Sequence, residues 1–462
     1  MKESKIIADI RNMAYEEELE YAKNLSIQYI NGINQRSVFP TDEAINNLKA
    51  FDEDLNNEPV PIINILEKLN QYGSPATVAQ TGSRYFGFVN GGILPSALCS
   101  KWLTDTWDQN PALYVMSPIV SKIEEVCEKW LKDLLCLPES TVAGFVSGSS
   151  AATTLGLIAG RNYLLGQLGY SAERNGLFNA PGIKVVLGEG AHSTVYKALS
   201  MIGLGNERVI KVPCDKQGRI IVKQLPVLDN RTLLILQAGN VNTGAFDDFL
   251  TICPLATAAG AWVHVDGAFG LWAAASKSLS HLTYNVNLAD SWSVDCHKTL
   301  NASYDNGIIL CKHKDIFIKS LHMIGDYIIY DKNRDGMLYT AEMSRRARAI
   351  DLWATLKGLG KSGVIQLVDE LHDKAKYFAE LLEKGGLEIV NDVVFNQVLV
   401  YYQSDDKVIQ LIERVQKSGI CWLGGSKWQG KAVMRISVCS YKTSYRDIEI
   451  SAEDILKQAL LI

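Results

Sequence analysis

The first part of the chain has apolar residues that recur at helical spacing. They recur through Ile6, Ile10 and Met13 and again between residues 62 and 69, and this period predicts amphipathic helices separated by a turn. A pair of such helices alone would leave its apolar stripe in water. We therefore expect residues 1–74 to form a helical segment that packs on something larger, such as a second subunit.

From Pro75 the pattern changes to short apolar runs that alternate with helical segments, such as 151–165 and 247–259. The candidate strands are Lys184–Leu187, Leu233–Gln237, Trp262–Asp266, Ser291–Asp295 and Gly307–Cys311. Near-continuous apolar strands that alternate with helices are typical of a mostly parallel sheet covered on both faces. The pattern predicts a large α/β domain over residues 75–343, with a mobile loop over 324–343.

The remainder of the chain, residues 344–462, reads as a small α+β domain. Its expected elements are helices over 347–360 and 364–383, strands near 387–390 and 397–402, a further helix, a strand at 433–439 and a last helix. The end of the helix over 347–360 and the residues after it form a G-x-G-x-x-G string, Gly358, Gly360 and Gly363. Because this string follows a helix and not a strand, a helix end closed by glycine is the expected structure, in place of a dinucleotide site.

Composition narrows the class of protein. Of the 462 residues, 47% are hydrophobic and 21% are charged, as in an ordinary globular protein. The net charge of −5 supplies no general attraction for nucleic acid or an acidic membrane. The nine cysteines form no C-x-x-C pair, and the start, MKESKIIADIRNM, lacks the apolar core of a signal peptide. We expect a reduced, cytoplasmic protein with neither a nucleic-acid nor a membrane partner.

Polar side chains follow three of the predicted strands at the point where each strand ends. His192 comes after the first strand, Asp266 ends the third, and His297 and Lys298 follow the fourth. Ligands of open α/β sheets bind at the carboxyl ends of the strands. One pocket is therefore expected to hold a lysine, an acid and two histidines.

This set of side chains suits pyridoxal phosphate. A lysine amine can form a Schiff base with it, a carboxylate can keep its pyridine nitrogen protonated, and a flat imidazole can cover its ring. The segment GFVSGSSAATTLGL places Gly148, Ser149 and Ser150 at a helix N-terminus, where free N–H groups favour a phosphate. Each residue alone is more often a solvated lysine or an ordinary cap, so the combination carries the interpretation.

The matching segments are AHSTVYKA, GNVNTGAFDDF, WVHVDGAFG, SVDCHKTLN, SRRARAIDLWATLKGLG and RISVCSYKT. In this order, from SRYFGFVNGG near Ser83 onward, the chain resembles the group II pyridoxal-phosphate-dependent amino-acid decarboxylases, which act on aromatic amino acids, glutamate and histidine. The resemblance implies an aspartate-aminotransferase-like fold (fold type I), a homodimer with active sites at the interface, and decarboxylation of an L-amino acid to its amine.

The resemblance also implies a role for each matching residue. Lys298 would form the Schiff base, Asp266 would pair with the pyridine nitrogen, Ala268 would lie beneath the ring and His192 would cover its other face. Ser149, Ser150 and His297 would hold the phosphate, with Asn242 or Asn240 nearby. Two positions depart from the family pattern: Cys296 stands where proline is usual, and Gly267 where alanine is common. Neither change removes a reacting group.

A tyrosine on a mobile loop donates a proton in the related enzymes, and the matching loop here is GDYIIYDKNRDGMLYTAEM. Tyr339 is the candidate donor, with Tyr327 and Tyr330 as alternatives, and simple packing is the alternative for each. The substrate pocket is expected to include Tyr85, Phe86, Phe88, Trp107 and Tyr114, by loose correspondence with the family. These residues tolerate an aromatic substrate but are also typical of a core.

Other functions remain open at this point. Aldehyde synthase, lyase or aminotransferase chemistry would use the same cofactor. A function of a different class comes from residues 331–342, DKNRDGMLYTAE, which have the spacing of an EF-hand calcium loop, so a calcium-responsive binding protein is possible. EF-hands usually pair, no second loop is present, and an Asx-rich polar loop is the alternative. The basic residues Arg345, Arg346 and Arg348 are expected to form salt bridges and not a nucleic-acid patch.

Overall fold

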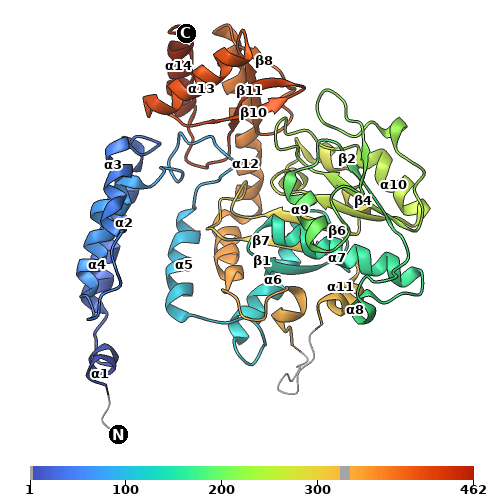
Figure 1. Ribbon diagram of the computed structural model, residues 1–462, viewed down its shortest axis with the longest axis horizontal. Helices are drawn as coiled ribbons and strands as arrows, with labels where there is room; N and C mark the ends of the chain where they lie inside the picture. Colours follow the sequence, from blue (N-terminus) through green and yellow to red (C-terminus); the bar gives the residue numbers. More distant parts are fainter. Residues whose placement is uncertain (1–3, 323–332) are drawn as a thin grey trace.

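The computed structural model describes residues 4–322 and 333–462 (Figure 1). Its α-helices are α1 Lys5–Arg11, α2 Glu16–Gly32, α3 Asp42–Asn46, α4 Ile62–Lys68, α5 Pro95–Trp107, α6 Pro118–Leu134, α7 Ser149–Gln167, α8 Ala172–Asn175, α9 Ser193–Met201, α10 Phe249–Ala259, α11 Lys314–Leu321, α12 Arg348–Lys384, α13 Asp405–Ser418 and α14 Tyr445–Ala459. Its strands are β1 Val142–Val146, β2 Lys184–Gly188, β3 Ile210–Val212, β4 Thr232–Gln237, β5 Trp262–Asp266, β6 Ser291–Asp295, β7 Gly307–Cys311, β8 Glu388–Ile389, β9 Gln397–Tyr401, β10 Gly424–Trp428 and β11 Lys431–Ser437.

The central sheet of the described chain has seven strands in the order β1-β7-β6-β5-β4-β2-β3. The strands from β6 through β5, β4 and β2 to β3 are parallel, whereas β7 runs antiparallel to both β6 and β1. Alternate residues of β4 pack in two different cores. Leu234 and Leu236 pack on one face of the sheet, and Leu233 and Ile235 pack on the other. The expectation of a mostly parallel sheet covered on both faces is therefore confirmed.

Helix α7 lies close against this sheet because two of its glycines face the strands. A methyl group on Gly156 would come within 2.6 Å of the ring of His264, and one on Gly160 within 2.7 Å of the indole of Trp262. The two glycines are four residues apart and so share one face of the helix. This close packing positions the N-terminus of α7 at the carboxyl ends of the parallel strands.

A second sheet, β10-β11-β9-β8, is antiparallel and forms a separate core with α13 and α14. Helix α12 connects the two cores. Its first part contributes Leu352 and Leu356 to the core of the large sheet, and its last part contributes Phe378 and Leu382 to the small one. The proposed boundary at residue 344 stays a prediction, since α12 belongs to both cores.

The glycine string in α12 is a break between helical segments and not a dinucleotide loop. Gly360 has φ 63° and ψ 174°, a backbone conformation that interrupts the helix. Such a positive φ is accessible to glycine at little cost. The expectation of a helix end closed by glycine is therefore confirmed.

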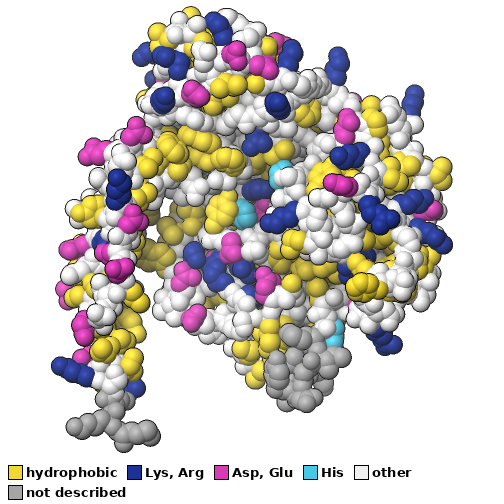
Figure 2. All heavy atoms as spheres, in the orientation of Figure 1, with side chains coloured by type: hydrophobic (Ala, Val, Ile, Leu, Met, Phe, Trp, Pro, Cys, Tyr) yellow, Lys and Arg dark blue, Asp and Glu magenta, His cyan; other side chains and the backbone are white. Residues whose placement is uncertain are grey.

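The N-terminal helices form an arm at one side of the molecule, drawn in blue in Figure 1. No residue of α1, α2 or α4 is buried. Hydrophobic side chains lie along the edge of the arm that faces the rest of the chain (Figure 2). Within residues 4–322 and 333–462, no helix is long and apolar enough to cross a membrane.

The segment with EF-hand spacing packs into the protein where the structure describes it. Arg334 is buried and pairs with Glu124 at 3.0 Å and Glu128 at 2.8 Å, and the Asp335 carboxylate accepts the Tyr114 N–H at 2.8 Å. Asp331 lies outside the described residues. These contacts engage Arg334 with α6 and Asp335 with Tyr114, a packing that does not favour the calcium-binding alternative.

The three arginines that follow form salt bridges, as expected. Arg345 pairs with the buried Glu124 at 2.6 Å, Arg346 with Asp351 at 2.9 Å, and Arg348 with Asp305 at 3.0 Å. The expectation that these side chains make ion pairs and not a nucleic-acid patch is confirmed. They fasten the start of α12 to α6 and to the turn after β6.

Replacing Gly160 by alanine tests the close packing of α7. Alanine is the better helix former by about 1 kcal/mol, but crowding against Trp262 costs about 1–3 kcal/mol. We expect Gly160→Ala to lower the free energy of unfolding, measured by thermal and urea denaturation. Gly166→Ala is the matched control: it lies in the same helix, its methyl group meets nothing within 4 Å, and it should be neutral or stabilising. Equal effects of the two substitutions would contradict the packing argument.

Candidate active site

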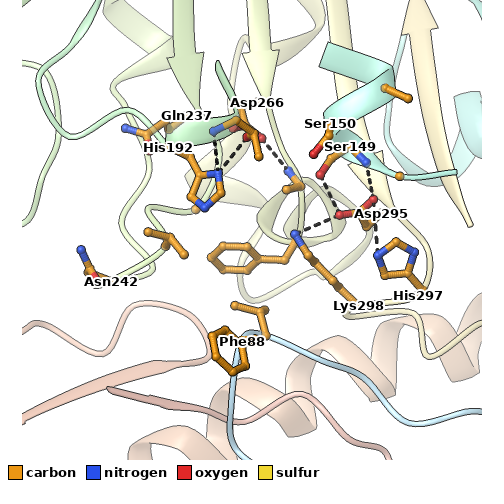
Figure 3. A pocket seen from close by; sticks show the side chains of 18 of the residues that line it. Phe88, Ser149, Ser150, His192, Gln237, Asn242, Asp266, Asp295, His297 and Lys298 are labelled. Carbon is orange, nitrogen blue, oxygen red and sulfur yellow. Dashed lines mark hydrogen bonds and ion pairs between the residues drawn. The ribbon is translucent and has the colours of Figure 1, made fainter. Parts of the chain in front are cut away.

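A cavity of about 660 Å³ opens at the carboxyl ends of the parallel strands (Figure 3). Its lining comes from both sheets, from the N-terminus of α7 and from the segment before α5. The lining residues are Phe88, Val89, Ser147, Gly148, Ser149, Ser150, Ala151, His192, Thr194, Gln237, Gly239, Val241, Asn242, Asp266, Ala268, Phe269, Asp295, His297, Lys298, Ser426 and Arg435. All eight residues that we expected to contact the cofactor are among them.

Three strand ends supply the central polar groups. His192 follows β2, Asp266 is the last residue of β5, and His297 and Lys298 follow β6. Because β5 lies between β4 and β6, and β2 is the next strand after β4, these ends meet on one edge of the sheet. Residues far apart in the sequence therefore share one cavity.

The buried carboxylate of Asp266 accepts few hydrogen bonds. Its Oδ1 accepts the Ala268 N–H at 3.2 Å. Burial raises the pKa of Asp266 above its usual value, and electrostatic interactions with His192 and Lys298 only partly oppose that effect. A buried carboxylate in this condition is stabilised by a cation placed beside it. The protonated nitrogen of a pyridine ring fits this requirement.

His192 is the N-cap of α9, and its ring lies at the cavity (Figure 3). Nδ1 accepts the Thr194 backbone N–H at 3.3 Å and lies 2.8 Å from the Thr194 hydroxyl. Since Nδ1 accepts a hydrogen bond, the proton of the neutral ring is on Nε2. Burial lowers the pKa of His192, which favours the neutral imidazole at the cavity.

Asp295 was not among the residues we expected in the site. Its Oδ1 accepts the Ser149 N–H at 2.5 Å, its Oδ2 accepts the Ser149 hydroxyl at 2.7 Å, and Lys298 Nζ lies 2.9 Å from Oδ2. Burial acts to raise the pKa of Asp295, but Lys298, His297 and the hydrogen bond from Ser149 outweigh it, and the pKa lies below its usual value. Asp295 ends β6 within SVDCHKTLN, so its place in that segment was the available signal.

The N-terminus of α7 is set by a close contact with β7. A methyl group on Gly307 would lie 2.4 Å from Cα of Gly148, the residue that precedes α7. Gly267, where the family commonly has alanine, is equally confined, since its methyl group would lie 2.6 Å from Leu271 Cβ. Small residues at these points let the backbone approach the cavity closely.

The C-terminal sheet adds Arg435, which the sequence did not mark as a pocket residue. Its Nη1 donates to the Val241 carbonyl at 3.4 Å, and burial lowers its pKa. Among the residues described, no carboxylate forms an ion pair with it within 4.0 Å. It belongs to the RISVCSYKT segment, but only the folded chain brings that segment to the cavity.

Asn242 and Asn240, the two asparagines expected near the phosphate, lie in different surroundings. The Asn242 amide oxygen accepts the Ser426 hydroxyl at 2.7 Å, and Figure 3 shows Asn242 on the side of the cavity away from Ser149 and His297. This position does not support a role at the phosphate. Asn240 is buried and accepts the N–H groups of Asn242 and Thr243, so it shapes the turn.

Four of the five expected substrate-pocket residues do not line this cavity. Tyr85 stacks on Trp422 with ring centroids 5.1 Å apart, and Phe86 packs edge-on against Phe378 in the small core. Trp107 is 46% exposed at the end of α5, and Tyr114 lies beside Asp335. Of the five, Phe88 lines the cavity in the described chain, and the roles of the other four in binding substrate stay predictions.

Tyr339 is also not brought to the cavity. It is 7% exposed, and its ring lies 3.9 Å beneath the guanidinium carbon of Arg334. Its neighbours belong to the core on the α7 face of the sheet. This packing argues against Tyr339 as the proton donor. The alternatives Tyr327 and Tyr330 lie outside the described residues.

Comparison with known proteins decides the family. Residues 46–403 match the model described as the pyridoxal-dependent decarboxylase conserved domain. This match covers most of the chain. The chain belongs to the pyridoxal-dependent decarboxylase family.

Relatives of this pyridoxal-dependent decarboxylase include an aromatic-L-amino-acid decarboxylase from Bacillus atrophaeus, 24% identical over 95% of this chain and 93% of the relative. An aspartate 1-decarboxylase from Aliivibrio fischeri is 28% identical over 53% of this chain and 48% of its own length. A crystal structure of Oryza sativa TDC with PLP and tryptamine has a TM-score of 0.89 at 19% identity, covering 100% of this chain and 99% of the other.

These findings confirm the expected fold, which is the fold type I arrangement of pyridoxal-phosphate enzymes. They also confirm the expected class of reaction. The protein is a pyridoxal-phosphate-dependent amino-acid decarboxylase, a carboxy-lyase. The buried, donor-poor carboxylate of Asp266 and the helix N-terminus at Ser149 are the features of this cavity that fit the cofactor.

Proposed function

We propose that Lys298 attaches pyridoxal phosphate covalently and that Asp266 holds its pyridine nitrogen. The observation that supports this assignment is that both side chains line one cavity at neighbouring strand ends. His192 and Ala268 cover the two faces of the ring. Ser149, Ser150 and His297 hold the phosphate at the start of α7, where backbone N–H groups and the helix dipole favour an anion.

Bound pyridoxal phosphate supplies a ring that withdraws electrons from the α-carbon of the amino acid. The negative charge of Asp266 would stabilise the proton on the ring nitrogen, because burial raises the pKa of Asp266 and the groups around it only partly oppose that effect. The neutral His192 turns Nε2–H, the nitrogen not bonded to Thr194, toward the amino acid. The walls formed by Val241 and Phe269 exclude water from one side of the cavity.

Arg435 binds a carboxylate of the amino acid in this proposal. It is a cation at the cavity with a single long hydrogen bond to a carbonyl, and a guanidinium binds a carboxylate in a fixed orientation. Orientation matters here because the bond that breaks must stand perpendicular to the ring of the cofactor. The relatives act on different amino acids, aromatic in one case and aspartate in another, so we assign an L-amino acid and leave its side chain open.

Lysine substitution tests the covalent attachment. We expect the wild-type protein, reduced with borohydride in the presence of pyridoxal phosphate, to carry the mass of one cofactor on the peptide that contains Lys298. Lys298→Ala should lose this mass because, among the described residues that line the cavity, Lys298 is the one lysine. Lys277→Ala, at an exposed lysine, is the control and should keep it. Attachment that survives in Lys298→Ala would contradict the assignment, as measured by mass spectrometry.

A screen of the common L-amino acids tests the reaction. We expect one or a few to release carbon dioxide together with the corresponding amine, and Arg435→Gln to reduce kcat/KM for that substrate by about 10–100-fold, the effect of a lost charged hydrogen bond. Aldehyde with ammonia, or transfer of the amino group to a keto acid, would instead support the aldehyde synthase or aminotransferase alternatives.

We propose a homodimer, on the evidence of exposed apolar side chains on the N-terminal arm (α1, α2 and α4). Leu19 and Ile30 of α2 are 60% and 39% exposed, and Ile7 of α1 is 53% exposed. A hollow of about 680 Å³ lies between α2, α4 and α5, with a lining that includes Leu25, Ile30, Leu66, Leu69, Leu98 and Trp102. Apolar surface of this extent is usual at an interface and unusual on a monomer. A second copy of the chain is the occupant that we propose, with the active sites near the contact.

Sedimentation velocity tests the dimer. We expect a particle of twice the chain mass of 51.0 kDa. Ile30→Asp should shift it toward the monomer, since a buried charge in an apolar interface is costly. Gln28→Asp, an exposed polar position two residues away in the same helix, is the control and should leave the dimer intact. A wild-type monomer at micromolar concentration would overturn the proposal.

We also propose a cytoplasmic location. All nine cysteines are free thiols, and six of them are buried: Cys127, Cys253, Cys296, Cys311, Cys421 and Cys439. Thiols kept reduced are typical of proteins in the cytoplasm, where disulfides seldom form.

A further inference from the structure

Ser149 and Lys298, to which the proposed function assigns the phosphate and the cofactor, contact the carboxylate of Asp295 in the structure. The Asp295 carboxylate takes the Ser149 backbone N–H and the Ser149 hydroxyl with its two oxygens. Its Oδ2 also contacts the Lys298 amine at 2.9 Å, and its Oδ1 lies 3.7 Å from Nε2 of His297. These are the groups to which the proposed function assigns the phosphate and the covalent bond.

Asp295 is fixed firmly in this position. It is 1% exposed, and the backbone of β6 and the turn that follows it hold it in place, since the Asp295 N–H donates to the Ala268 carbonyl at 2.9 Å. Its carboxylate stays charged, because its positive neighbours outweigh the effect of burial on its pKa. The chain therefore keeps a permanent negative charge directly beside the N-terminus of α7.

A phosphate near Ser149 and His297 would place a second negative group next to that charge. Like charges separated by a few ångströms repel strongly where water is excluded. The carboxylate also competes for the Ser149 N–H and hydroxyl, because each donor satisfies one strong acceptor at a time. Both effects act against the phosphate and not against the ring of the cofactor.

We propose that Asp295 is a positioning residue that orders Ser149 and Lys298 before the cofactor binds and, by its charge, weakens the hold on the phosphate. This inference rests on the proposed function, since it takes the phosphate site at α7 as given. The Lys298 amine is then held by a counter-ion at a set place instead of moving freely in the cavity. The ordering of Ser149 and Lys298 thus lowers the affinity for the phosphate.

The test measures how much the phosphate group contributes to the affinity for the cofactor. Full-length protein freed of cofactor is titrated with pyridoxal phosphate and, separately, with pyridoxal, and the change in absorbance gives a dissociation constant for each. The ratio of the two constants measures what the phosphate contributes. We expect Asp295→Asn, which removes the charge and keeps the shape, to increase this ratio by about tenfold or more in favour of pyridoxal phosphate.

Two controls accompany the measurement. Ser149→Ala removes the hydroxyl but keeps the charge of Asp295, so it should not increase the ratio. Asp54→Asn changes the net charge by the same amount at an exposed site and should leave the ratio unchanged. If Asp295→Asn does not fold, Asp295→Ser removes the same charge with a smaller side chain and is expected to give the same increase.

An unchanged or reduced ratio in the neutral variants, with wild-type attachment to Lys298 intact, would overturn this inference while leaving the proposed function in place. Loss of attachment to Lys298 in the wild-type protein would overturn the proposed function itself.

Discussion

Two buried carboxylates at neighbouring strand ends are the constraint on which the site depends. Asp295 has a full set of partners in the chain itself, from Ser149 and Lys298. Asp266 has one backbone donor and a raised pKa. A protein tolerates a buried charge only if something compensates it. The charge of Asp295 is compensated by its partners, whereas that of Asp266 is compensated only in part. In the proposed function, the protonated ring nitrogen of the cofactor would supply the rest.

The rest of the fold keeps these two charges at a fixed separation. Parallel strands β5 and β6 are neighbours in register, with Asp266 opposite Ser293, so the two acids sit on adjacent strands of a rigid sheet. Helix α7 lies near the two acids because Gly156 and Gly160 have no side chains to hold the helix away from the strands. Gly307 likewise leaves room for Gly148, the residue before α7. The small C-terminal sheet closes the cavity from the other side and contributes Arg435. Each layer thus supplies one group to a site that no single layer contains.

The sequence predicted the interior of the sheet better than its edges. β5, β6 and β7 have the predicted bounds because strands buried on both faces read as continuous apolar runs. The direction of β7 was not predicted, since an apolar run carries no sign of its orientation. Three strands were missed. The short edge strand β3, with Ile210 38% exposed, and the polar hairpin strand β10 have no buried pattern. The edge strand β1 is buried throughout, but its VAGFV run leads directly into the segment that was read as a helix start. For the site, strand ends placed His192, Asp266 and Lys298 at one cavity. Arg435 and the pairing of Asp295 with Ser149 depend on contacts between distant segments. The stacking of Arg334 on Tyr339 could not be read from spacing either, and the choice of the loop tyrosine stays a prediction.

A crystal structure of the protein with pyridoxal phosphate tests the central claim most directly. The account predicts one ring held between Lys298 and Asp266, with the ring nitrogen within hydrogen-bond distance of the Asp266 carboxylate and the phosphate at the first turn of α7. A ring whose nitrogen faces away from Asp266, or a phosphate bound elsewhere in the cavity, would contradict it.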